Sequence, residues 1–175
     1  MNLPTWITVS RLLGAPIVLY LLATPSVPHQ WIALGVFLIA AGTDWLDGYL
    51  ARRLNQVTDL GKFLDPLVDK LLVFAPLLGL VELGVIPAWG VFLILVRELA
   101  IAGWRVNPAT QATSGIQGAN LWGKAKTVVQ IAAIALLIAP LPDVWYLPSQ
   151  GLFWFAVVLT WVSGVIYLWP KPMTP

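Results

Sequence analysis

The sequence contains no cysteine, a single histidine and few charged residues. The absence of cysteine excludes disulfide frameworks, thiolate metal sites and cysteine nucleophiles. Because His29 is the only histidine, a histidine-ligated metal centre is also unexpected. Charged residues make up 10% of the 175 residues, whereas a soluble domain usually has about 25%. The net charge of +2 does not indicate a nucleic-acid partner. These shortages argue against a water-soluble domain.

Apolar residues make up 59% of the chain, and ten residues are tryptophan, which favours the membrane–water interface. A helix needs about 20 mostly apolar residues to cross the hydrocarbon core. Six stretches meet this requirement, namely 6–23, 31–50, 63–80, 86–104, 125–141 and 151–169. We therefore predict an all-α integral membrane protein in which residues 1–175 form a single bundle of six transmembrane helices.

The ten Lys and Arg residues indicate the orientation of this bundle. With six helices, both termini and the connections 51–62 and 105–124 share one side, and every cation lies there or in the adjoining half of a helix. The opposite connections, 24–30, 81–85 and 142–150, contain no Lys or Arg. Cytoplasmic loops carry the excess of positive charge in membrane proteins. We expect a multi-pass protein of the cell (inner) membrane with both termini in the cytoplasm.

Two pairs of aspartates lie near the cytoplasmic ends of the second and third expected helices. Asp44 and Asp47 are three residues apart, and Asp65 and Asp69 are four apart, so each pair shares one helical face. Asp44 and Asp69 each lie six residues from the inner end of their expected helix, which places both about 9 Å deep. Carboxylates gathered at one depth require counter-charge. All-oxygen ligands favour Mg²⁺ or Mn²⁺, and two such ions can clamp a phosphoryl group. The alternative is simple ion pairing with Lys or Arg.

The segment between the two pairs suits a diphosphate ligand. Small residues allow a ligand to approach the backbone closely, and an arginine is a permanent cation. The full string reads Asp44-x-x-Asp47-Gly48-x-x-Ala51-Arg52-x8-Gly61-x3-Asp65-x3-Asp69. This pattern resembles the complete signature of the CDP-alcohol phosphotransferase family.

The resemblance implies a six-helix membrane enzyme that moves a phosphatidyl group from a CDP-linked lipid to an alcohol and releases CMP. It further implies that Asp44, Asp47 and Asp65 ligate a two-ion centre. Asp69 would contact the same centre and act as the general base. The expected CDP-binding residues are Gly48, Arg52, Thr58, Gly61, Asn2 and Thr8.

Further blocks resemble the phosphatidylglycerophosphate synthase branch of that family. These blocks are residues 2–11, 43–53, 97–99 with Arg105, and 123–130, whereas the last expected helix carries no marker. The reaction implied is an in-line transfer from CDP-diacylglycerol to sn-glycerol 3-phosphate that yields phosphatidylglycerol phosphate and CMP. The loop 106–114 departs from these relatives because it lacks their Lys and Arg residues.

A phosphorylated acceptor requires cations, and arginine can hold a phosphate with two hydrogen bonds. We expect some subset of four basic residues to bind it, namely Arg97, Arg105, Lys124 and Lys126. Arg97 would alternatively pair with an aspartate, and the two lysines would alternatively serve only as cytoplasmic anchors. Glu98 would either orient one of these cations or face water.

Two rival functions use the same residues differently. The first keeps the chemistry and changes the acceptor to inositol phosphate, serine or another alcohol. The second is a divalent-cation transporter, although the internal repeats and broken helices common in transporters are not visible. The resemblance also implies a homodimer, and small residues on helix faces are compatible with such packing.

Overall fold

The computed structural model describes the backbone of residues 3–53, 59–106 and 121–168, and the side chains of residues 10–43, 66–104 and 122–167. These ranges contain helices and no strand. The elements are α1 (Leu3–Ala23), α2 (Val27–Arg53), α3 (Asp59–Glu82), α4 (Ala88–Val106), α6 (Leu121–Ile138), the short 3-10 helix η1 (Asp143–Trp145) and α7 (Tyr146–Leu168). The predicted all-α architecture and the order of six long helices are therefore confirmed.

The helices α2 and α7 begin earlier than predicted. Pro28 and Pro148 were expected to lie in connections, but each lies in the first turn of its helix. A proline is accepted there because the first N–H groups of a helix have no partner within the helix. At the other end, α2 continues to Arg53 and α3 starts at Asp59, so both helices extend further toward their connection than expected.

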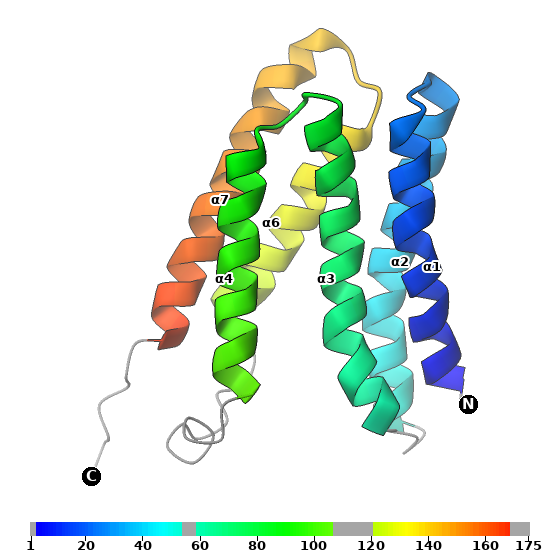
Figure 1. Cartoon of the computed structure of the whole chain (residues 1–175), viewed down its shortest axis with the longest axis vertical. Coiled ribbons are helices and arrows are strands. Elements are labelled where there is room, and N and C mark those ends of the chain that lie inside the picture. The colour runs from blue at the N-terminus through cyan, green and yellow to red at the C-terminus, as the bar shows by residue number, and fades with distance from the viewer. Residues whose placement is uncertain (1–2, 54–58, 107–120, 169–175) are drawn as a thin grey trace.

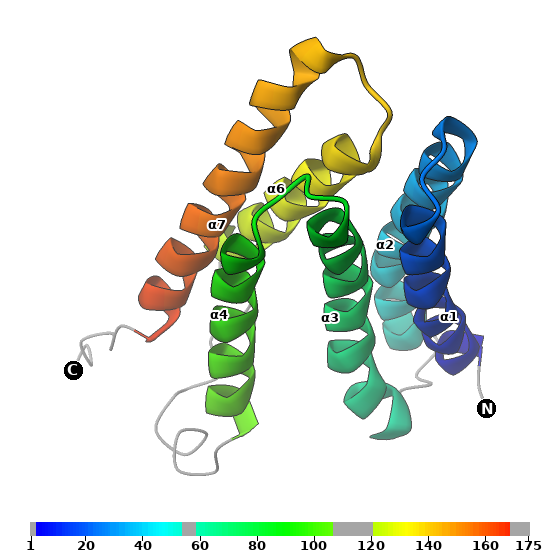
Figure 2. The same ribbon diagram turned by 45° about the horizontal axis from the view of Figure 1, so that its top comes forward.

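The helices form two groups that are bridged by α6 (Figure 1). Helix α1 packs against α2 and α3, whereas α4 packs against α7. Helix α6 contacts α7 in one group and α2 and α3 in the other, and it crosses obliquely between them in both views (Figure 2). The start of α1 and the end of α7 lie at the same end of the molecule, here called the lower end after its place in Figure 1.

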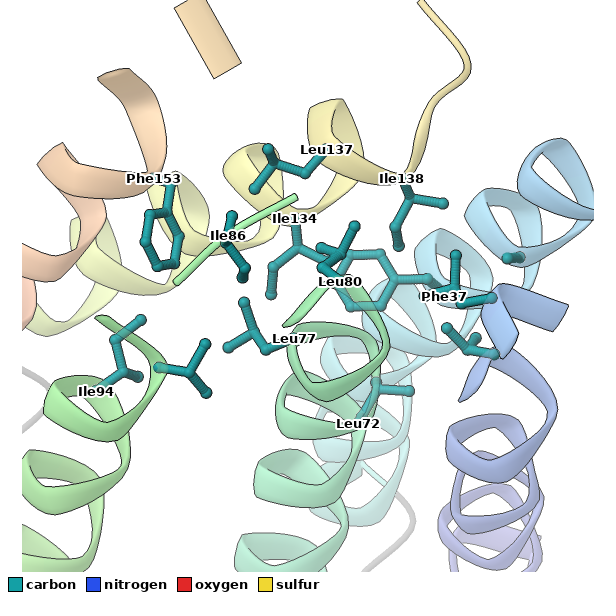
Figure 3. Packing of buried hydrophobic residues seen from close by; sticks show 14 of the residues in the cluster. Phe37, Leu72, Leu77, Leu80, Ile86, Ile94, Ile134, Leu137, Ile138 and Phe153 are labelled. Carbon is teal, nitrogen blue, oxygen red and sulfur yellow. The ribbon is translucent and has the colours of Figure 1, made fainter. Parts of the chain in front are cut away.

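The hydrophobic core lies toward the opposite, upper end, where the short connections are found. Buried side chains from all six long helices meet there. Figure 3 labels several of them, among them Phe37, Leu72, Leu77, Leu80, Ile94, Ile134, Leu137, Ile138 and Phe153. The α3–α4 connection turns at Gly84, whose φ of 70° lies in the left-handed region that favours glycine. Because α3 and α4 separate toward the lower end, this upper core is what holds the two groups together (Figures 1 and 2).

One helical segment, Asp143–Tyr167, is by itself long and apolar enough to cross a membrane, judged over the described residues. The other helices carry charged residues or shorter apolar runs, and the apolar parts of two of them are Ser10–Ala23 and Val27–Thr43. Apart from Glu82 at the upper end of α3, the charged residues of the long helices lie at or below the middle of their helix, which is where the predicted site residues are found.

Candidate active site

The four predicted metal-binding aspartates lie on two helices that pack against each other. Asp44 and Asp47 belong to α2, and Asp65 and Asp69 belong to α3. Asp44 is nine residues from the end of α2 at Arg53, and Asp69 is ten residues from the start of α3 at Asp59. At 1.5 Å per residue these positions are about 14 and 15 Å from the helix ends. Both positions therefore lie farther from the ends of their helices than the expected distance of about 9 Å, because both helices are longer, and the two distances still match.

The side chains of Asp44, Asp47 and Asp65 lie outside the described part of the chain. Among the side chains that the structure does describe, no three Asp, Glu or His residues gather into a group that would hold a metal ion. The convergence of all four carboxylates stays a prediction. The backbone supports it, because the four positions lie at similar heights on adjacent helices.

Asp69 has a defined partner on α1. Arg11 donates a hydrogen bond from Nη1 to Oδ1 of Asp69, at 3.1 Å. The Arg11 side chain is only 1% exposed, whereas the Asp69 side chain is 48% exposed. The Arg11 side chain is thus buried, whereas the side chain of the aspartate that it contacts is half exposed. The sequence could not show this ion pair, because the two residues are 58 positions apart.

The predicted CDP-binding residues are placed only by their backbones. Gly48 and Arg52 lie in the last turns of α2, Gly61 lies in the first turn of α3, and Thr8 lies in α1. Asn2 and Thr58 lie outside the described residues. Their roles remain predictions, and the helical positions near the α2–α3 connection are compatible with them.

Two of the predicted acceptor-phosphate residues meet on one carboxylate. Glu98 Oε1 accepts a hydrogen bond from Nη1 of Arg97 at 2.8 Å and another from Nζ of Lys126 at 2.6 Å. Arg97 also donates from Nη2 to the hydroxyl of Ser163 on α7, at 2.9 Å. We call Arg97, Glu98, Lys126 and Ser163 the Glu98 cluster. It joins α4, α6 and α7 through side chains.

The three charged members of the Glu98 cluster are largely buried. Their side chains are 11% exposed for Arg97, 17% for Glu98 and 10% for Lys126. Burial of charged groups is costly unless they are paired, and here each of the three is paired with a group of opposite charge. Lys126 is therefore not simply an anchor at the surface. The carboxylate that pairs with Arg97 belongs to Glu98, whereas the sequence analysis had considered an aspartate as the alternative partner.

The other two predicted cations are not placed in this cluster. Lys124 is exposed and lies two positions from Lys126 on α6, and residues two apart do not share a helical face. The side chain of Arg105 lies outside the described part of the chain. The structure thus brings together Arg97 and Lys126 and separates Lys124 from them.

Two residues of α7 were missed by the sequence analysis, one a member of this cluster and the other next to it. Ser163 binds Arg97, and the adjacent Gly164 lies directly against the arginine side chain. A Cβ atom at position 164 would lie 3.0 Å from Nε and 3.2 Å from Cγ of Arg97. The available signal was a Ser-Gly pair within an apolar helix, but nothing in the sequence connected it to Arg97.

Comparison with known proteins agrees with the sequence motif. A family model described as CDP-alcohol phosphatidyltransferase matches residues 1–162. The chain belongs to the CDP-alcohol phosphatidyltransferase family. The match includes the whole motif from Asp44 to Asp69 and ends just before Ser163. The resemblance to this family is therefore confirmed.

Named members of the CDP-alcohol phosphatidyltransferase family are similar over nearly the whole chain. The CDP-diacylglycerol–glycerol-3-phosphate 3-phosphatidyltransferase of Bacillus subtilis is 44% identical over 181 residues, which cover 95% of this chain and 93% of that protein. The protein of the same name from Escherichia coli is 35% identical over 172 residues, with 95% and 93% covered. A cardiolipin synthase (CMP-forming) from Oryza sativa is 34% identical over 187 residues, which cover 97% of this chain and 55% of the rice protein.

Proposed function

We propose that this protein transfers the phosphatidyl group of CDP-diacylglycerol to sn-glycerol 3-phosphate, which yields phosphatidylglycerol phosphate and CMP. The observation that carries the proposal is the 44% identity over 95% of the chain to a protein named for this reaction. The Glu98 cluster supports the choice of a phosphorylated acceptor. Arg97 and Lys126 converge on one carboxylate oxygen at 2.8 and 2.6 Å, as two cations would on a phosphate oxygen.

The chain's own residues have distinct roles in the proposed transfer. Asp69 accepts the proton of the attacking glycerol hydroxyl, because its side chain is half exposed and is oriented by Arg11. The hydroxyl oxygen then forms a bond to the β-phosphorus, which bears the diacylglycerol, and the bond from this phosphorus to the CMP oxygen breaks. Arg52 holds the diphosphate during this step. Transfer is direct, since no residue stands out as a nucleophile.

The aspartates at positions 44, 47, 65 and 69 fit a site for Mg²⁺ or Mn²⁺. Their carboxylates are hard oxygen donors, and two packed helices carry them at similar heights. Two ions bound there would neutralise the non-bridging phosphate oxygens and the charge on the departing CMP. The roles proposed for Asp69 and for the cationic residues rest on the chemistry of their own side chains.

We further propose that all six long helices span the cell (inner) membrane and that the lower end faces the cytoplasm. Large apolar side chains are exposed around the molecule, including Ile39 on α2, Phe92 on α4 and Val128 on α6, each more than 60% exposed. So much exposed apolar surface suits contact with lipid chains. A homodimer within the membrane stays a prediction.

The absence of cysteine makes this topology easy to test. Ser26 is exposed between α1 and α2, and Gly103 is exposed near the lower end of α4 with open space around it. We expect a membrane-impermeant thiol reagent to label Ser26→Cys in right-side-out vesicles and Gly103→Cys only in inverted vesicles. Labelling of both variants from the same side would refute the proposed orientation.

The acceptor is tested with the purified protein in detergent, supplied with CDP-diacylglycerol and Mg²⁺. The panel contains glycerol 3-phosphate, inositol phosphate, serine and phosphatidylglycerol, the last because cardiolipin carries two phosphatidyl groups on one glycerol. We expect CMP release to depend on glycerol 3-phosphate. Release with only another acceptor would overturn this assignment. CMP release without any membrane gradient would exclude the transporter, because cation transport does not produce CMP.

A further inference from the structure

We propose that three residues hold Arg97 and Lys126 in position for the phosphate of the acceptor. These positioning residues are Glu98 on α4 and Ser163 and Gly164 on α7. The inference rests on the proposed function, in which Arg97 and Lys126 bind glycerol 3-phosphate. It adds α7 to the acceptor site, although this helix carries no motif residue.

Glu98 permits the two cations to lie close together. Two buried positive charges repel each other strongly where the local dielectric constant is low. A carboxylate oxygen shared by Arg97 and Lys126 offsets this repulsion, and the three side chains together keep one net positive charge. An arginine has five N–H donors and a lysine has three. Each cation therefore keeps donors for a phosphate while it is bound to Glu98.

Helix α7 fixes the other side of the arginine. Ser163 accepts a hydrogen bond from Nη2 of Arg97 at 2.9 Å and donates its own hydroxyl proton to the carbonyl oxygen of Thr160 at 2.9 Å. The hydroxyl is thus oriented by its own helix, so its lone pair faces the guanidinium. The two ends of the guanidinium are bound to different helices, α4 through Glu98 and α7 through Ser163.

The glycine next to Ser163 provides the space for the arginine stem. With a Cβ at position 164, contacts of 3.0 Å to Nε and 3.2 Å to Cγ of Arg97 would force the arginine to shift by a few tenths of an ångström. The Nε atom is buried and finds no hydrogen-bond partner among the described residues. Because no hydrogen bond from these residues holds Nε in place, a shift of the stem would move the whole guanidinium and misalign its remaining donors.

A purely structural cluster makes a different prediction from a positioning one. If the Glu98 cluster only ties α4, α6 and α7 together, its disruption lowers stability and impairs both substrates equally. If it positions Arg97 and Lys126, a small displacement raises the KM for glycerol 3-phosphate and leaves the KM for CDP-diacylglycerol unchanged. The two substrates therefore separate the two roles.

The most direct test compares Gly164→Ala with Gly151→Ala on the same helix. Both variants gain the same methyl group in α7, but a Cβ at position 151 meets nothing within 4 Å. We expect Gly164→Ala to raise the KM for glycerol 3-phosphate about tenfold, because the weakening of hydrogen bonds to a charged group lowers affinity by roughly this factor. Gly151→Ala should behave as the parent. Equal kinetics for the two variants would overturn the inference.

A second pair of variants examines the hydroxyl group and does not depend on the folding of Gly164→Ala. Ser163→Ala removes the acceptor of Arg97 Nη2, whereas Ser163→Thr keeps a hydroxyl on the same atom. We expect Ser163→Ala to raise the KM for glycerol 3-phosphate several-fold and Ser163→Thr to restore most of the parent value. If the threonine variant is as impaired as the alanine variant, the hydroxyl is not the positioning group.

The direction in which Glu98→Gln changes the KM for glycerol 3-phosphate tests the role of Glu98. As a positioning residue, Glu98 supports binding, so its replacement should raise the KM for glycerol 3-phosphate. A fall in this KM would mean that Glu98 competes with the phosphate for the cations and would overturn the inference.

Arg97→Gln and Lys126→Gln test the underlying function. If neither affects the KM for glycerol 3-phosphate, the acceptor site itself is wrong; if they do and the α7 variants do not, only the positioning role fails.

Discussion

Arg11 of α1 and Asp69 of α3 form an ion pair whose two members are in opposite environments. The Arg11 side chain is 1% exposed and the Asp69 side chain is 48% exposed, with 3.1 Å between Nη1 and Oδ1. Helix α1 therefore does more than cover α2 and α3, because it directs the carboxylate that we propose as the general base. A charged side chain within the apolar α1 has its explanation in this contact.

We predict that Arg11 and Asp69 are energetically coupled. Asp69→Asn deprives the buried guanidinium of a charged partner, and Arg11→Gln removes the guanidinium itself, so each change should lower the Tm in detergent. In free energy of unfolding, the double variant should lose about 1 kcal/mol less than the sum of the two single losses, because one member of the pair, Asp69, is half exposed. Strict additivity of the two losses would contradict a direct interaction.

Asp69→Asn should lower turnover by at least about 10²-fold, the low end for a positioned acid–base group. An amide cannot accept the proton of the attacking hydroxyl, but its similar shape leaves the fold intact. The control is Asp143→Asn, since Asp143 is exposed on η1, outside the proposed site. CMP release by both variants is the measurement. A near-parental rate in Asp69→Asn would remove this residue from the role of general base.

Asp44→Asn should weaken the dependence on divalent metal. If Asp44 is a ligand, loss of its charge shifts the Mg²⁺ or Mn²⁺ titration of CMP release to higher concentrations, and chelation should abolish release in the parent. Asp143→Asn again serves as the control and should titrate as the parent does. An unchanged titration in Asp44→Asn would show that Asp44 does not ligate the metal.

Gly90→Ala should destabilise the contact between α4 and α7. A Cβ at this position would lie 2.8 Å from two ring carbons of Phe153, which is 1% exposed and cannot move aside freely. Overpacking of this kind costs about 1–3 kcal/mol. Gly103→Ala is the matched control on α4, because it meets nothing within 4 Å. The Tm in detergent should fall for Gly90→Ala alone; equal Tm values would show that the ring accommodates the methyl group.

The number, order and apolar character of the helices could be predicted from the sequence, because long apolar runs and their breakers are local features. The spacing of Asp44, Asp47, Asp65 and Asp69 is local as well, and it was sufficient to identify the family. The ends of the helices were less predictable. Pro28 was expected to break a helix and lies in the first turn of one, because a proline has opposite effects at the start and in the middle of a helix.

The amino-acid sequence alone determined which helices this protein has and which acids and bases lie on each of them, since both follow from neighbours along the chain. Only the tertiary structure decided which of those charged groups meet. The partners Arg11 and Asp69, Glu98 and Lys126, and Arg97 and Ser163 are 58, 28 and 66 residues apart. Such pairs depend on how helices pack and rotate against one another, and that is set by side-chain packing over the whole bundle.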